Sequence, residues 1–174
     1  MLATKKRFRN KKSQILGIPF NMLFAIILII IFLAVAIYAI VMFLNLRKCA
    51  DTASFKYDLQ QEIDRAYSSD EASNEISLNL PSAIEKVCFI DLNKESKGKD
   101  KEKYSALKKT GLVNVNMFFY PLKNACGNQK TGLISHINIS EITKQDNPYC
   151  LENTDGKVKI RLEKSTFEAL VKIR

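Results

Sequence analysis

The chain has 174 residues and a formal net charge of +9, from 27 Lys and Arg against 18 Asp and Glu. Residues 1–46 hold six of these cations and no acid, so the remaining 128 residues carry 21 cations and 18 acids. A nearly neutral domain of this kind has no strong positive field, which argues against a nucleic-acid partner.

Residues 1–18 are predicted to form a basic cytoplasmic tail. Its six cations are Lys5, Lys6, Arg7, Arg9, Lys11 and Lys12. Beyond the apolar segment that follows, only Arg47 and Lys48 lie close to the membrane. Lys and Arg near the end of a membrane span stay on the cytoplasmic side. The asymmetry therefore predicts the N-terminus inside the cell and the C-terminal part outside, and the tail also suits anionic lipid head groups.

The next segment, Met22 to Leu44, is apolar throughout and predicts a transmembrane helix over residues 19–46. It has 23 residues without charge, Gly or Pro, and a helix needs about 20 apolar residues to cross a bilayer. A buried helix of a soluble protein is the alternative, but such a helix keeps a polar face. A cleaved secretory signal has a shorter apolar region, of roughly 7–15 residues, so we expect an uncleaved signal-anchor.

Residues 47–68 are predicted to extend this helix as an amphipathic segment. No Gly or Pro occurs between Phe20 and Pro81, and one helical face carries an apolar stripe. Its members are Phe55, Leu59, Ile63 and Ala66. We expect the stripe to pack on a sheet and Gln60, on another face, to be of little importance for stability. Two helices with a break at the membrane surface are the alternative.

Residues 69–174 are predicted to form an extracytoplasmic β-rich domain. Alternating or apolar segments predict strands at 76–80, 84–90, 112–120, 133–142, 157–163 and 170–173. Asp155-Gly156 predicts a hairpin turn, residues 104–109 a short helix, and the charged residues 93–103 a solvated loop. The expected fold class is α+β, with a long N-terminal transmembrane helix that continues into an amphipathic helix packed on a small, mainly antiparallel sheet.

Four cysteines, Cys49, Cys88, Cys126 and Cys150, all lie beyond the apolar segment. This placement predicts two disulfides formed in an oxidising compartment. Of the three connectivities we favour Cys49–Cys88 with Cys126–Cys150, while free buried thiols are the alternative. Zinc sites usually have Cys pairs two to four residues apart, and no such pair occurs here.

No catalytic, cofactor or metal site is indicated. His136 is the single histidine, and no Ser or Cys nucleophile can be assigned to it. Asn138-Ile139-Ser140 matches an N-glycosylation acceptor, so Asn138 is a candidate for modification.

The layout resembles that of type IV pilins and pilin-like proteins, including archaeal ones. They share a basic leader, one long helix that is hydrophobic and then amphipathic, and a disulfide-tied β domain. Residues 11–14, Lys-Lys-Ser-Gln, are similar to the cleavage region of their signal. The resemblance implies Ser13 and Gln14 as the scissile pair, export, and assembly into a filament or pseudopilus through the apolar half of the helix.

We therefore expect a single-pass protein of the cell membrane with a non-enzymatic structural or assembly role in the envelope. The lipid bilayer is its expected partner, together with a homo- or hetero-oligomer formed through the span. The alternative is a membrane-tethered module that binds a protein or glycan partner outside the cell. No cofactor, nucleic acid or small-molecule substrate is indicated.

Overall fold

The computed structural model describes residues 19–111 and 113–174. The chain divides into two compact units, Met1–Phe43 and Leu44–Arg174, close to the expected end of the span at residue 46. The basic tail, with the candidate cleavage pair Ser13 and Gln14, lies outside the described residues.

Helix α1 extends from Phe20 to Ser68 as a single element, so the expected continuous helix is confirmed. Pro19 immediately precedes it, and the Pro19 carbonyl accepts a hydrogen bond from Met22 N at 2.7 Å. Every residue from Phe20 to Lys48 is exposed in the isolated chain. This stretch is long and apolar enough to cross a membrane.

In the second unit, α1 changes from apolar all round to amphipathic. Its buried residues are Thr52, Phe55, Leu59, Ile63 and Ala66, at intervals of three or four residues. The Thr52 hydroxyl donates to the Lys48 carbonyl at 2.7 Å, so its polar group is satisfied within the helix. The apolar members of this stripe belong to the main hydrophobic core of the unit.

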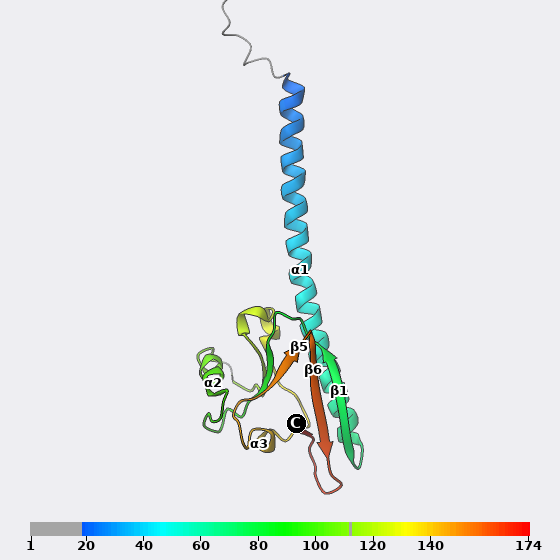
Figure 1. Cartoon of the computed structure of the whole chain (residues 1–174), viewed down its shortest axis with the longest axis vertical. Helices are drawn as coiled ribbons and strands as arrows, with labels where there is room; N and C mark the ends of the chain where they lie inside the picture. The colour runs from blue at the N-terminus through cyan, green and yellow to red at the C-terminus, as the bar shows by residue number, and fades with distance from the viewer. Residues whose placement is uncertain (1–18, 112) are drawn as a thin grey trace, which may run out of the picture. The chain divides into compact units, whose positions relative to one another are not determined.

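The sheet is antiparallel and contains seven strands in the described residues (Figure 1). The strands are β1 (Ala72–Asn79), β2 (Lys86–Phe89), β3 (Met117–Tyr120), β4 (Thr131–Gly132), β5 (Tyr149–Thr154), β6 (Lys157–Lys164) and β7 (Lys172–Ile173). Their order is β1-β6-β5-β2-β3-β4. Strand β7 lies outside this order and pairs with β6. The expected α+β class is confirmed, and the sheet is open.

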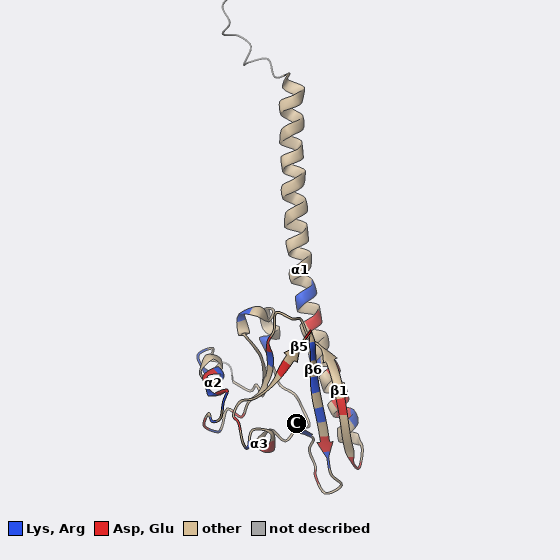
Figure 2. Cartoon of the chain, viewed as in Figure 1, with Lys and Arg blue, Asp and Glu red and all other residues tan. Residues whose placement is uncertain are grey.

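The longest pairing joins β1 to β6 over eight residues, with Ile76 opposite Ile160. On β6 the apolar residues Val158, Ile160 and Leu162 are at most 1% exposed, while the residues between them carry charge (Figure 2). The turn Asp155-Gly156 has positive φ at both positions, 53° and 80°, as a tight hairpin of this type requires. The predicted final hairpin is therefore confirmed.

Strands β2 and β3 are buried on both faces, which explains why their sequences are continuously apolar. Phe89 and Phe119 face the main core with α1, and the Phe55 and Phe119 rings meet edge-on with centroids 5.6 Å apart. On the opposite face, Cys88 and Phe118 form a second core with Tyr104 and Leu107. The last two residues belong to α2 (Lys101–Lys108), which corresponds to the expected short helix.

The strand expected over residues 133–142 is wrong. His136 has a φ of +63°, which interrupts extended backbone. Asn138 then caps the short helix α3 (Ile139–Ile142) by accepting a hydrogen bond from Glu141 N at 3.1 Å. The strand expected over 112–120 is likewise shorter, because only Met117–Tyr120 pairs as β3 and Asn114 has a φ of +59°.

Two 3-10 helices, η1 (Leu122–Asn124) and η2 (Gly127–Lys130), follow β3. The Asn124 amide donates to the Ala83 carbonyl at 2.6 Å, and Asn116 bonds the main chain of Ile134 in both directions at 2.7 Å. Side-chain amides therefore position the loops at both ends of β3, a role that hydrophobic periodicity does not reveal.

Candidate functional site

Both disulfides form, but with a connectivity that differs from the favoured one. The pairs are Cys49–Cys126 and Cys88–Cys150, so the preference for Cys49–Cys88 with Cys126–Cys150 is wrong. Cys88 and Cys150 are directly opposite each other on β2 and β5. They meet because these two strands are neighbours in the sheet, although the cysteines are far apart in the chain. All four cysteines are paired.

The two disulfides lie in different surroundings. Cys88–Cys150 is part of the second core, where Cys88 is 0% and Cys150 is 8% exposed. Cys49 and Cys126 are only partly buried, and their bond joins α1 to the residue that precedes η2. Further along α1, the Lys56 ammonium donates to the Thr131 carbonyl at 3.1 Å, and partial burial lowers the pKa of Lys56. The η1–η2 region is thus fastened to α1 at two points.

His136 belongs to a cluster at the end of α1. Its Nδ1 lies 2.9 Å from Asp64 Oδ1, and its ring stacks on Tyr67 with centroids 4.0 Å apart. The hydrogen bond from His136 lowers the pKa of Asp64, with a further contribution from Gln60. This histidine therefore attaches a loop to α1, and no Ser or Cys hydrogen-bonds to its ring among the described residues.

Gln60 takes part in the same attachment. Its Oε1 accepts a hydrogen bond from Ser135 N at 2.9 Å, and its Nε2 donates to Asp64 Oδ1 at 2.7 Å. Gln60 thus lies beside the apolar stripe and bonds the 133–137 loop, a contact that the sequence analysis did not anticipate. The Lys164 ammonium donates to the carbonyls of Tyr67 and Ser69, both at 2.6 Å.

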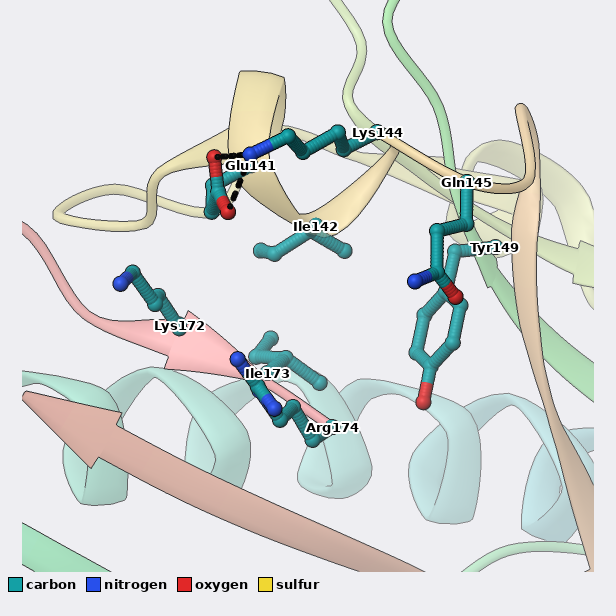
Figure 3. Close-up of a pocket in the computed structure, with 8 residues that line it drawn as sticks. All are labelled: Glu141, Ile142, Lys144, Gln145, Tyr149, Lys172, Ile173 and Arg174. Atoms are coloured by element: carbon teal, nitrogen blue, oxygen red, sulfur yellow. Dashed lines mark hydrogen bonds and ion pairs between the residues drawn. The ribbon is translucent and has the colours of Figure 1, made fainter.

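A pocket of about 260 Å³ lies between α3 and β7 (Figure 3). Three cations border it, and each is paired with an acid. The pairs are Lys144 with Glu141 at 3.2 Å, Arg174 with Glu163 at 3.1 Å, and Lys172 with Glu168. Burial raises the pKa of Tyr149, whose ring forms one wall. Each cation that lines the pocket is thus already in contact with a carboxylate, and Glu163 also pairs with Arg161 at 2.9 Å.

A second hollow, of about 550 Å³, has a different electrostatic character. Its lining residues are Thr110, Leu122, Lys123, Gly127, Asn128, Lys130 and Thr131. No carboxylate lines it, and neither Lys123 nor Lys130 has an ion pair with any residue that the structure describes. Sequence reasoning missed this hollow, because its lysines are isolated in the sequence.

Asn138 uses its side-chain oxygen to cap α3, and the capping bond does not involve the amide nitrogen that would carry a glycan. Glycosylation of Asn138 stays a prediction. Over residues 19–111 and 113–174, no group of three His, Cys, Asp or Glu side chains is placed to hold a metal ion.

Comparisons of the chain with protein-family models, with curated proteins and with solved structures find no match. Function is therefore inferred from the residues of this chain alone.

Proposed function

We propose that this is a single-pass membrane-anchored protein with a non-enzymatic structural or assembly role in the cell envelope, similar to that of a pilin. One observation carries the proposal: α1 has no buried residue from Phe20 to Lys48 and a continuous buried stripe from Thr52 to Ala66. The first part of this helix thus exposes apolar side chains on all sides, and its second part packs into the core of the β domain.

The exposed apolar part of α1 supports insertion into a bilayer. Its side chains are large, including Phe32 at 69% and Ile37 at 63% exposure. A contiguous apolar surface of this extent is unfavourable in water and marks a membrane or protein contact. In lipid, the intrahelical hydrogen bonds satisfy the main chain, and helix–helix packing becomes available for lateral assembly.

The proposed orientation has the N-terminus in the cytoplasm and the β domain outside. The cation asymmetry of the sequence favours it. The pairing of all four cysteines in the second unit also supports it, because disulfides persist mainly in oxidising compartments.

The assembly role is tested on the full chain extracted from its native membrane into mild detergent. A pilin-like protein should sediment as an oligomer, and its first residue should be Gln14 if the leader is removed. A monomer that begins at Met1 or Leu2 would contradict assembly through the span and would favour the alternative function below.

The alternative is a membrane-tethered binding module, and Phe167 favours it. This side chain is 99% exposed in the loop between β6 and β7. A hydrogen bond from Glu168 N to the Ser165 carbonyl at 2.9 Å closes the turn that carries Phe167, and Glu168 also pairs with Lys172. An aromatic side chain that a closed turn presents to solvent is suited to enter an apolar pocket of a partner protein.

A further inference from the structure

We propose that the hollow between η1–η2 and Thr110, in the turn after α2, binds the phosphate head group of an anionic phospholipid, with Lys123 and Lys130 as its cations. The inference rests on the proposed anchoring of α1 in the membrane. It adds a lipid partner to a domain whose overall charge gives no indication of one.

The disulfide Cys49–Cys126 places the hollow close to the end of the apolar segment. Leu44 and Leu46 are the last large apolar residues of that segment and are 50% and 57% exposed. Cys49 follows Leu46 by three residues, which corresponds to about 4.5 Å of rise along a helix. Cys126 is bonded to it with the two Cα atoms 5.0 Å apart, and η2 begins at the next residue, Gly127. If Leu46 lies at the edge of the bilayer, η2 lies at the level of the head groups.

The charge of the hollow fits a phosphate group. Lys123 and Lys130 are exposed and lack carboxylate partners in the described part of the chain, unlike the three paired cations of the pocket between α3 and β7. Lys48 adds a further exposed cation on α1. The nearest acid along α1, Asp51, is paired with Arg47 at 3.9 Å. The charges of Lys123 and Lys130 are therefore available to an anion. Figure 2 shows the cations on α1 and on η1–η2.

The uncharged lining suits a lipid better than a bare ion. Leu122 is half-buried and supplies an apolar wall, while Asn128 is exposed and supplies an amide donor. The volume of about 550 Å³ exceeds what an inorganic anion requires. Lysines close to an anionic membrane surface each strengthen binding, and the effect weakens within a Debye length of about 10 Å at 0.1 M salt.

The test uses the full chain in detergent and measures bound lipid by native mass spectrometry, with phosphatidylglycerol as the anionic probe and phosphatidylcholine as the neutral one. We expect phosphatidylglycerol to bind at least ten-fold more tightly at low salt. Replacing both lysines, Lys123→Ala with Lys130→Ala, should weaken its binding about 25-fold, since each lysine contributes about five-fold. The charge-conserving pair Lys123→Arg with Lys130→Arg should retain it.

Lys157→Ala with Lys159→Ala is the matched control, because it removes the same charge from two exposed lysines of β6. Equal binding of the two lipids, or an equal loss in this control, would overturn the inference. Full competition by glycerol 3-phosphate at the same concentration would also overturn it, because the site would then bind soluble phosphates. Flotation with liposomes at alkaline pH separates the two proposals: a chain that does not float contradicts anchoring, whereas a chain that floats without lipid preference contradicts only this inference.

Discussion

Leu59 lies at the centre of the buried stripe of α1 and is 0% exposed. Replacing Leu59 by Ala should lower the free energy of unfolding by about 2–5 kcal/mol, because the smaller side chain leaves a cavity. Asp58→Ala is the control, since Asp58 is exposed and should change stability by no more than about 0.5 kcal/mol. Chemical unfolding of the full chain in detergent measures both. Equal midpoints would mean that α1 does not pack on the sheet.

Asp64 should make the stability of the domain sensitive to acid. Its pKa is lowered in the folded chain, mainly by the hydrogen bond with His136. A carboxyl group with a depressed folded pKa stabilises the fold above its unfolded pKa of about 3.9, and this contribution is lost as the pH falls through the folded value. Asp64→Asn should thus be less stable than the unmodified chain at pH 6, and the difference should narrow below about pH 4. Unfolding midpoints at pH 6, 4 and 3 would show this.

The control for that experiment is Asp58→Asn, because Asp58 is exposed and lies on the same helix. It removes one carboxylate of α1 and leaves the contact between Asp64 and His136 in place. A constant difference for Asp64→Asn over the same range would show that the contact with His136 does not couple protonation to folding.

Helical spacing alone placed Phe55, Leu59, Ile63 and Ala66 on one face, and these residues are buried. Spacing did not reveal the bonds that Gln60 makes to Ser135 and Asp64. The bond to Ser135 depends on a loop that is 75 residues away in the chain, and a periodic pattern carries no information about such a contact.

The element pairs joined by disulfides give a prediction at the scale of secondary structure. Proteolysis of the unreduced protein should release one peptide pair that links α1 to the η1–η2 region and another that links β2 to β5. Loop closure over 77 and 62 residues predicts that each bond stabilises the fold by about 4 kcal/mol. Mass spectrometry of the peptides provides the readout. A peptide that links Cys49 to Cys88 would contradict this arrangement of strands.

Elements with a strong local signal were predictable, whereas elements that depend on tertiary contacts were not. The alternation in β6 and the Asp155-Gly156 turn identify the last hairpin from sequence. Residues 133–142 contain isoleucines that suggest a strand, but Asn138 favours a helix cap there. Strand order is also absent from the local pattern, which is why the cysteine pairing could not be deduced.

At the scale of the whole molecule, the distribution of charge along the sequence supports the proposed membrane orientation. It does not reveal how the charges of the domain are arranged in space. The near balance of residues 47–174 hides the hollow at η1–η2, where the fold brings Lys123, Lys130 and Thr110 together. The pocket at α3 and β7 shows the opposite arrangement, in which the fold places an acid beside each cation. Neither arrangement follows from composition.

The topology of the chain is tested most directly by adding protease to intact cells that express the full protein. Anchoring through α1 with the N-terminus inside predicts that residues 47–174 are degraded from outside, while an epitope on the N-terminal tail stays protected until the cells are lysed. A cytoplasmic protein that survives the treatment shows that the cells are intact. Full protection of the C-terminal domain in intact cells, with degradation only after lysis, would contradict the extracytoplasmic placement.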